Sequence, residues 1–350
     1  MPHGGTAGNP LAGIGATARD EIALDDVPGA VILVGHDGKT VYRAAFGTST
    51  PGTPLRPDAV FDLASLTKVV VTAPAIMQLR EAGRLRLDDP VALYWPGFAR
   101  NGKGRITIRQ LLTHTSGLRP DLVSTNWQGE AGALAQIAAE RPIATPGSAF
   151  IYSDLNFIVL GALVERLSGE SLPLYAQQHI FAPLGMADTG FDPPPGEAAR
   201  LVPTDTQAPG IVQDPTARRM GGAAGHAGLF STADDLARFC RMLLNGGSLD
   251  GARILSPQSV ALMTAPEALP GGVIRGLGWD MASTYSSWTG GAFSPASYGH
   301  TGYTGTALWI DSVTNTYLII LTSRLYPYGN GDAMPLRRGV ARAVGQAFPP

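Results

Sequence analysis

The segment Phe61-Asp62-Leu63-Ala64-Ser65-Leu66-Thr67-Lys68-Val69-Val70-Val71 carries a serine and a lysine three residues apart. In a helix this spacing places Ser65 and Lys68 on one face, one turn apart. A serine hydroxyl is a poor nucleophile unless a nearby base takes its proton. A lysine can be that base where burial or neighbouring cations lower its pKa. The mostly apolar run that follows predicts such burial, so we expect a lowered pKa for Lys68.

The chain has two other lysines, and both follow turn signals. Lys39 comes after an Asp-Gly pair, and Lys103 lies in an Asn-Gly-Lys-Gly sequence. Both are therefore expected at the surface, which leaves Lys68 as the lysine in an apolar run. The alternative for this segment is an N-capping Ser65 followed by a helix-surface lysine. The choice depends on whether the chain supplies the other parts of an acyl-transfer site.

The composition is that of a globular protein with a large core. Of 350 residues, 44% are hydrophobic and 15% charged, and the net charge is −2. The length predicts about two domains or one large composite, and the charge gives no indication of a nucleic-acid partner. No apolar run reaches the ~20 residues of a membrane span. The single cysteine, Cys240, excludes an internal disulfide and is expected to be a buried thiol.

The cellular compartment can be judged only from the first ten residues. Met1 to Pro10 has neither the charged region nor the apolar region of a signal peptide. The chain as written is therefore expected in the cytoplasm, and a removed leader would place it in the periplasm or outside. The compartment and the oligomeric state stay open.

The order of predicted elements indicates the fold class. A hairpin of strands at 30–34 and 40–46 turns at Asp37-Gly38, after a short N-terminal helix. Periodicity predicts helices from 65 to 83, at 107–112, 131–139, 156–167, 174–181, 231–244, 256–263 and 335–347, and strands at 276–279, 307–310 and 316–322. Strands at both ends predict an α+β fold, a three-layer α/β/α arrangement with one antiparallel sheet flanked by helices.

This order also predicts the domain organisation. Residues 1–64 and 215–350 are expected to form an α/β sheet domain, and residues 65–214 an inserted, mostly helical domain. The stretch from 193 to 225 is rich in proline and glycine and predicts an excursion without regular structure. The active site is expected in the cleft between the two domains.

Two further segments carry candidate site residues. Tyr152 precedes the strongest helix, where its phenol could relay a proton between serine, lysine and leaving group; the alternative is a packing tyrosine with a Ser153 or Asp154 cap. Gly299-His300-Thr301-Gly302-Tyr303-Thr304-Gly305 opens a C-terminal strand, and its glycines would let a substrate backbone pair along this edge. The alternative there is a Gly-rich turn with a solvated histidine.

The segment Leu111-Leu112-Thr113-His114-Thr115-Ser116-Gly117-Leu118 is a helix end followed by a loop of hydroxyl residues. We expect its hydroxyls and His114 to satisfy the loop backbone, with direct catalysis by His114 as a minor alternative.

In their order, these motifs resemble those of the serine β-lactamase and penicillin-binding-protein superfamily. Ser-Leu-Thr-Lys, Tyr-Ser-Asp and His-Thr-Gly stand in the places of S-x-x-K, Y-x-N and K/H-T-G. The loop around His114 and the segment Gly225-His226-Ala227-Gly228-Leu229-Phe230-Ser231-Thr232-Ala233-Asp234-Asp235-Leu236 are also similar. The resemblance is to the class C branch, which holds class C β-lactamases, DD-carboxypeptidases and carboxylesterases, and it covers nearly the whole chain.

The resemblance implies a role for each matching residue. Ser65 would be the nucleophile, and Lys68 and Tyr152 the proton-transfer pair. The oxyanion hole would be the backbone N–H groups of Ser65 and Tyr303. Asp154, His300, Thr301 and Gly302 would contact the substrate. No metal and no cofactor are implied.

Two residues depart from the family pattern. Asp154 replaces an asparagine, and a carboxylate accepts hydrogen bonds where an amide can donate them. A carboxylate near Lys68 would also favour the charged form of the lysine. Asn156 cannot stand in, because two residues further along a helix it faces another way. His300 replaces a lysine, and a mostly neutral imidazole recruits a carboxylate less strongly.

These departures favour a DD-peptidase-like hydrolase over a dedicated β-lactamase. We therefore expect a serine acyl hydrolase that forms an acyl-enzyme on Ser65, with weak β-lactam turnover. Its substrate would be a small molecule or peptide with an amide or ester carbonyl. The alternatives are a carboxylesterase for short acyl esters and, more remotely, a non-catalytic module that binds cell-wall ligands.

Overall fold

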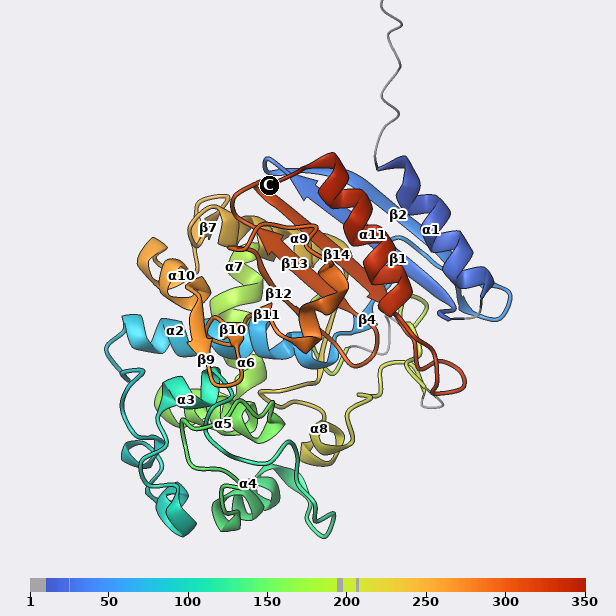
Figure 1. The fold of residues 1–350 in the computed structure, drawn as a ribbon. Coiled ribbons are helices and arrows are strands. Elements are labelled where there is room, and N and C mark those ends of the chain that lie inside the picture. Colours follow the sequence, from blue (N-terminus) through green and yellow to red (C-terminus); the bar gives the residue numbers. More distant parts are fainter. Residues whose placement is uncertain (1–10, 25, 194–197, 206–207) are drawn as a thin grey trace, which may run out of the picture.

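A computed structural model describes residues 11–24, 26–193, 198–205 and 208–350. The expectation about a signal peptide rests on residues 1–10 and lies outside the described residues, as do parts of the predicted excursion at 193–225. Figure 1 shows a central sheet with helices packed against it and a largely helical region beside it. None of the helices in the described chain is long and apolar enough to cross a membrane.

The central sheet is antiparallel and has nine strands in the order β3-β2-β1-β14-β13-β12-β11-β10-β9. Its strands are β1 (Gly29–His36), β2 (Lys39–Thr50), β3 (Thr53–Pro54), β9 (Glu267–Leu269), β10 (Val273–Arg275), β11 (Asp280–Ala282), β12 (Tyr298–Thr301), β13 (Ala307–Asp311) and β14 (Thr316–Thr322). β1 pairs with β14 from Ala30 opposite Thr322 to His36 opposite Thr316. The predicted sheet built from both ends of the chain is therefore confirmed.

Most of the other secondary-structure elements in the described residues are helices. They are α1 (Ala12–Ala23), α2 (Ala73–Glu81), α3 (Ile108–Leu112), α4 (Gly129–Ala139), α5 (Asp154–Ser168), α6 (Leu172–Ala176), α7 (Ala182–Leu184), α8 (Pro215–Met220), α9 (Ala233–Leu244), α10 (Pro257–Thr264) and α11 (Met334–Ala347). Short strands β4 (Phe61–Asp62), β5 (Gly190–Phe191) and β6 (Leu229–Ser231) form a second small sheet, and β7 (Ser248–Leu249) pairs with β8 (Ala252–Arg253).

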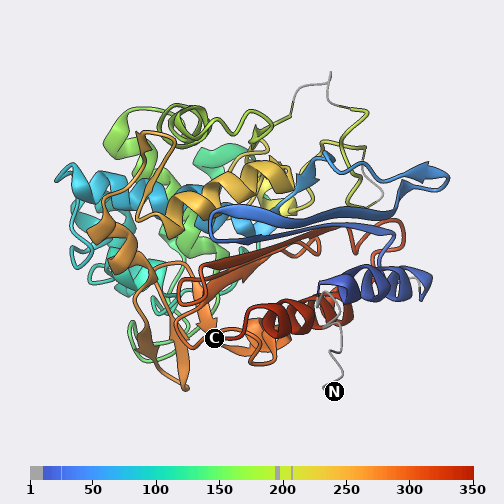
Figure 2. The ribbon, with the colours of Figure 1, turned by 90° about the horizontal axis from the view of Figure 1, so that it is seen from above.

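The two faces of the sheet are covered by different helices. Alternate residues of a strand point to opposite faces, and in β1 Ile32 belongs to the core under α1 and α11. Its neighbours Val31 and Leu33 belong to the larger core that contains α9, α2 and α5. Figure 2 shows α1 and α11 on one side of the sheet and α9 on the other. The predicted α/β/α layering is confirmed; the division at residues 64/65 and 214/215 stays a prediction.

One predicted strand is wrong. Residues 276–279 form the turn between β10 and β11, in which the Gly276 N–H donates to the Trp279 carbonyl at 2.9 Å. Leu277 and Trp279 are both fully buried, which explains the strand-like apolar pattern. Gly278 has φ of 87°, a left-handed conformation that glycine adopts without strain.

The expected exposure of Lys103 is also wrong. Its side chain is buried, and its ammonium donates to the carbonyls of Arg100 and Ala138, each at 2.9 Å, and to that of Glu140. The turn around Asn101 forms as predicted, but the end of α4 lies over it. Burial lowers the pKa of Lys103 to about 8.

Candidate active site

The candidate nucleophile lies in a tight turn and not in a regular α-helix. Ser65 belongs to the 3₁₀ turn η1 (Ala64–Leu66), which leads through the π-helical turn η2 (Lys68–Thr72) into α2. Such π turns occur often at functional sites. Ala64 has φ of 47°, a conformation that costs a residue with a side chain about 1–3 kcal/mol. The surrounding structure must therefore hold this turn in place.

A buried carboxylate holds the turn. Asp62 accepts hydrogen bonds from the N–H of Ala64 at 2.8 Å and from the N–H of Gln213 at 2.7 Å. Its burial raises its pKa to about 6. The left-handed residue before Ser65 is thus fixed by a side chain two positions earlier.

Lys68 contacts Ser65 directly. Its ammonium donates to Ser65 Oγ at 2.8 Å and to the carbonyl of His226 at 3.2 Å, and it lies 2.6 Å from Asp154 Oδ1. The Lys68 side chain is fully buried, whereas Ser65 is partly exposed. The predicted one-turn spacing of serine and lysine therefore brings a hydroxyl and an amine into hydrogen-bond contact.

The expectation of a lowered pKa for Lys68 is wrong. Burial acts in the lowering direction, but the Asp154 carboxylate and the Tyr152 phenol together outweigh it, so the pKa of Lys68 is raised. The second expectation, that Asp154 would favour the charged lysine, agrees with this result. In the resting site Lys68 is an ammonium that donates to Ser65.

Tyr152 packs between the lysine and an aromatic layer. The Lys68 ammonium lies 5.0 Å from the centre of its ring, and the His114 ring stacks on it at 4.5 Å. His114 is fully buried; its Nδ1 accepts from the Ser153 N–H at 3.1 Å, and burial lowers its pKa well below the ordinary value. His114 thus supports the backbone beside Tyr152, as its sequence context predicts.

Asp154 and Asn156 have different surroundings. Asp154 is the first residue of α5, where its carboxylate lies against Lys68 with 23% of the side chain exposed. Asn156 is buried and accepts a hydrogen bond from Ser116 Oγ at 2.6 Å. The two side chains therefore point to different parts of the molecule, as the helical spacing predicts.

A cavity of about 290 Å³ opens next to Ser65. It is lined by Ser65, Tyr152, Arg275, Asp280, Tyr285, His300, Thr301, Gly302, Tyr303, Arg324, Asp332, Ala333, Met334 and Arg337. The candidates from β12 and the following turn therefore face the same space as Ser65 and Tyr152. Lys68 and Asp154 are not among the residues that line this cavity. The substrate roles of His300, Thr301 and Gly302 remain proposals.

The turn after β12 is fastened to the nucleophile segment. Thr304 Oγ1 donates to the Asp62 carbonyl at 2.8 Å, and Thr306 Oγ1 donates to the Leu63 carbonyl at 3.1 Å. A Cβ on Gly302 would lie 2.5 Å from the Leu63 carbonyl oxygen, closer than real Cβ atoms come. This close approach brings Tyr303 beside Ser65, where the two backbone N–H groups are our candidates for the oxyanion hole.

His300 and Arg275 both line the cavity. Burial and the Arg275 charge lower the pKa of His300 well below its ordinary value, so its imidazole is neutral. Arg275 is fully buried, lies over the Phe150 ring at 5.5 Å, and has Asp280 3.4 Å away. The sequence analysis missed Arg275; an arginine directly before the apolar Gly-Leu-Gly-Trp segment was the available signal.

Tyr285 and Tyr303 line the cavity. The sequence did not predict that their rings are exposed to solvent. Their side chains are 46% and 61% exposed. The Tyr285 ring lies 5.1 Å from that of Tyr152, and the Arg324 guanidinium lies 4.6 Å from the centre of the Tyr303 ring. Both rings thus present an amphipathic surface to a ligand.

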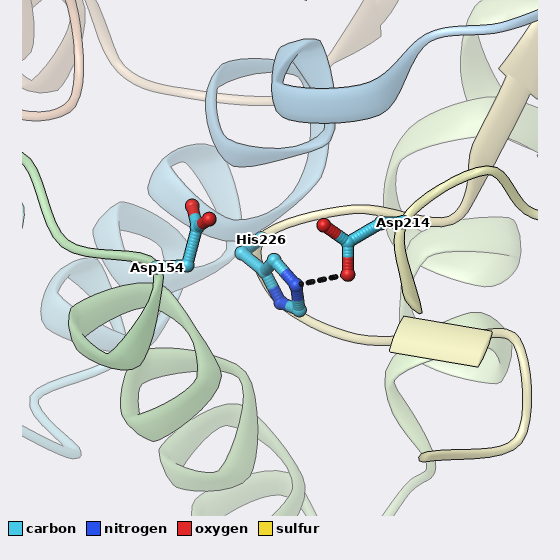
Figure 3. Close-up of side chains that lie close together, drawn as sticks. All are labelled: Asp154, Asp214 and His226. Atoms are coloured by element: carbon cyan, nitrogen blue, oxygen red, sulfur yellow. Dashed lines mark hydrogen bonds and ion pairs between the residues drawn. The ribbon is translucent and has the colours of Figure 1, made fainter. Parts of the chain in front are cut away.

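One group of described residues has the composition of a metal site. Ligand atoms of Asp154, Asp214 and His226 all lie within 4.8 Å of one another (Figure 3). All three residues are already engaged, because Asp154 contacts the Lys68 ammonium and His226 Nε2 lies 3.0 Å from Asp214 Oδ1. A divalent ion would compete with both contacts, and the lysine already supplies a cation.

Comparison with known proteins agrees with this geometry. The model of the Beta-lactamase family matches residues 17–343. A putative D-alanyl-D-alanine carboxypeptidase of Escherichia coli K12 is 31% identical over 342 residues, covering 85% of this chain and 78% of the relative. An N-acetylmuramyl-L-alanine amidase of Bacillus subtilis is 32% identical over 342 residues, covering 85% and 77%. The solved structure of a penicillin-binding-protein homologue from Caulobacter crescentus has a TM-score of 0.79 and 25% identity, covering 98% and 99%.

The family match spans nearly all of the chain, and Ser65, Tyr152 and the His300-Thr301-Gly302 segment line one cavity. The chain is therefore a serine hydrolase that belongs to the Beta-lactamase family.

Proposed function

We propose that this protein hydrolyses an amide bond of a cell-wall peptide through a covalent acyl-enzyme on Ser65, with peptides of the D-Ala-D-Ala type as its first substrate class. The contact between the Lys68 ammonium and Ser65 Oγ, at 2.8 Å beside a cavity, carries the proposal. The name of the E. coli relative, a putative D-alanyl-D-alanine carboxypeptidase, supports this substrate class, and that of the B. subtilis relative, an N-acetylmuramyl-L-alanine amidase, supports hydrolysis of an amide bond.

The charged state of Lys68 decides how the proton moves. A charged lysine can take the Ser65 proton only after it releases one of its own, and Asp154 is the carboxylate in contact with it. In the proposed step Ser65 Oγ attacks the carbonyl carbon, its proton passes to Lys68, and a lysine proton passes to Asp154. The negative charge that develops on the carbonyl oxygen is held by the N–H groups of Ser65 and Tyr303.

The leaving group then needs a proton. Tyr152 borders the cavity next to Ser65 and can give its phenolic proton to the leaving amine while the C–N bond breaks. The proton held by Asp154 returns through Lys68 to the Tyr152 phenolate. The same groups activate water to hydrolyse the acyl-enzyme, which restores the free serine and releases the acid.

Intact-mass spectrometry after incubation with a fluorescent penicillin tests the nucleophile. We expect an adduct on the wild type and none on Ser65→Ala. An adduct that persists would favour a penicillin target of the DD-peptidase kind, because slow deacylation traps the acyl-enzyme. Retained hydrolysis of an activated ester by Ser65→Ala would remove this residue from the mechanism.

Substrate comparison tests the amide assignment. We expect release of D-alanine from a peptide ending in D-Ala-D-Ala. Cleavage of p-nitrophenyl butyrate, with no penicillin adduct and no D-alanine release, would make the protein a carboxylesterase on the same fold. The hydrolase mechanism itself would be contradicted if Ser65→Ala kept both the release of D-alanine and the cleavage of p-nitrophenyl butyrate. It would also be contradicted if the wild type reacted with no acyl donor.

The exposed tyrosines at the cavity favour a second candidate. Tyr285 and Tyr303 offer two partly exposed rings beside Ser65, and aromatic rings of this kind pack against the apolar faces of sugars. This would suit the amide between an N-acetylmuramyl group and L-alanine, the bond in the name of the B. subtilis relative. An N-acetylmuramyl-L-alanyl peptide, assayed beside the D-Ala-D-Ala peptide, decides between the two candidates.

A further inference from the structure

The segment from Gly225 to Leu229 is attached along the whole length of the lysine-bearing turn. Thr72 Oγ1 donates to the Gly225 carbonyl at 2.6 Å, and the Leu229 N–H donates to Thr67 Oγ1 at 3.2 Å. Between these two bonds the Lys68 ammonium donates to the His226 carbonyl. The catalytic lysine and the backbone of His226 are therefore fixed relative to each other.

The other side of this segment is fixed by α5. A Cβ on Gly225 would lie 2.0 Å from the Phe157 carbonyl oxygen and 3.0 Å from the backbone of Gly161. Only glycine allows the segment to pass so close to the helix that begins with Asp154. His226 is thus held between the elements that carry Lys68 and Asp154.

The His226 side chain points toward a second carboxylate. His226 is 1% exposed, and its Nε2 lies 3.0 Å from Oδ1 of Asp214. Asp214 is also the N-cap of α8, where it accepts from the Ala217 N–H at 2.7 Å. Figure 3 shows the imidazole between Asp214 and Asp154.

The charges of this buried group balance only when His226 is protonated. Lys68 and Asp154 form one ion pair; His226 and Asp214 form a second one behind it. Asp121 is a further carboxylate nearby, and its pKa is raised, chiefly by burial and also by Asp154 and Asp214, which favours its neutral form. Buried charges are costly unless they are paired, so the imidazolium offsets a carboxylate that would otherwise add to the field at Lys68.

We propose that His226 and Asp214 are a positioning pair for the catalytic lysine: the His226 carbonyl orients the Lys68 ammonium, and the imidazolium held by Asp214 offsets the charge of Asp154. This inference rests on the proposed role of Ser65 and Lys68. Although burial opposes protonation, Asp214 and Asp154 raise the pKa of His226 above its ordinary value. Loss of the imidazolium removes a positive charge near Lys68, which raises the pKa of Lys68 and slows the release of the lysine proton that acylation requires.

NMR titration of the histidine side chains tests the charge of His226 without any assay of activity. The signal of His226 is identified by its absence in His226→Gln. We expect the wild-type imidazole to stay protonated above the ordinary pH range of histidine. Asp214→Asn should lower its pKa by about 1–3 units, because the opposite charge is removed. Asparagine caps helices as well as aspartate does, so α8 is retained.

The pH profile of kcat/KM for p-nitrophenyl butyrate tests the effect on the reaction. We expect an ionisation in the wild-type profile that moves to lower pH in Asp214→Asn and disappears in His226→Gln. If loss of the imidazolium raises the pKa of Lys68 by one unit, acylation at neutral pH falls about tenfold. Asp214→Glu keeps the carboxylate and should keep the profile near that of the wild type.

Asp235→Asn is the matched control. Asp235 is another buried carboxylate with two partners, the Asp188 N–H and Thr189 Oγ1, and it lies in α9 away from this group. Its substitution should leave the ionisation in place. An Asp214→Asn variant that is less stable but has an unchanged profile and an unchanged His226 titration would reduce the pair to a structural role and overturn the proposal. Because the assay uses an ester and NMR, failure to cleave D-Ala-D-Ala peptides refutes the proposed substrate without affecting this test.

Discussion

Lys68 and Lys103 are both buried, yet their surroundings drive their proton affinities in opposite directions. Lys68 lies against a carboxylate, and its pKa is raised. Lys103 donates only to backbone carbonyls in its close contacts, and its pKa falls to about 8. Carbonyl dipoles satisfy the hydrogen bonds of an ammonium. They offset less of the free-energy cost of burying its charge than a carboxylate does. The comparison teaches that burial lowers the pKa of a lysine only where no neighbouring carboxylate compensates for it.

Removal of the Lys68 amine should have the largest effect on the reaction. Lys68→Met leaves Ser65 without its proton-transfer partner, and general acid–base groups contribute about 10²–10⁴-fold to rates. We expect acylation by p-nitrophenyl butyrate to fall by this factor in stopped-flow measurements. Lys103→Met, the matched substitution at the other buried lysine, should leave the rate unchanged. Equal losses in both variants would show that general destabilisation causes the effect.

Asp154→Asn should make the surroundings of Lys68 resemble those of Lys103. Without the carboxylate, the pKa of Lys68 falls, and a neutral amine can take the Ser65 proton directly. Each unit of this fall increases the neutral fraction about tenfold, and the new amide can donate to a substrate carbonyl. We expect faster acylation by penicillin at neutral pH, followed by mass spectrometry. A decrease would mean that the proton route through Asp154 is faster than direct transfer to a neutral Lys68; no change would reduce Asp154 to a helix residue.

At the other lysine the expected effect is on stability. Lys103→Met leaves the carbonyls of Ala138 and Glu140 without their donor, whereas the Arg100 carbonyl keeps the backbone N–H of residue 103. Each buried group left unpaired costs about 1–3 kcal/mol, so the free energy of unfolding in urea should fall by at least this amount. An unchanged free energy would show that water replaces the ammonium at the carbonyls.

The pH dependence of the free energy of unfolding tests the lowered pKa of Lys103. This effect is the smallest of the effects predicted. The pKa of Lys103 is about 8 in the folded chain against an ordinary value of 10.5. Between these two values the unfolded chain binds more protons, so stability rises with pH. We therefore expect the wild type to gain stability relative to Lys103→Met from pH 8 to 10.5, measured as the difference between urea midpoints. A constant difference over this interval would contradict the lowered pKa.

Much of the fold could be predicted from periodicity and turn chemistry. The Asp37-Gly38 hairpin and α9 follow local rules, because the hairpin has a turn signal and the helix has one apolar face. The helix α5 is apolar along most of its length, and the pairing of the two chain ends follows from the positions of the strands along the chain. The 276–279 segment could not be assigned in this way. Its buried Leu277 and Trp279 alternate as in a strand, while the backbone makes a turn in which the Gly278 N–H donates to the carbonyl of the distant Leu112 at 3.0 Å.

The site was predictable where chemistry follows spacing, and not where it follows contacts between distant segments. Ser65 and Lys68 are three residues apart, so their meeting required only one turn. Arg275 reaches the cavity from β10, and the His226 carbonyl meets Lys68 from a segment 158 residues further along the chain. The raised pKa of Lys68 likewise depends on how close Asp154 comes, and the motif alone does not fix that distance.

The pairing of β1 with β14 has a consequence for the synthesis of the protein. Ala30 meets Thr322, so the sheet closes between segments almost 300 residues apart in the chain. Contacts of this sequence separation slow folding, because the chain must order a long intervening segment first. While the ribosome is still making the helical middle, β1 exposes an apolar strand without its final neighbour. Nascent chains of this protein therefore present an edge that can pair with other chains until the last strands emerge.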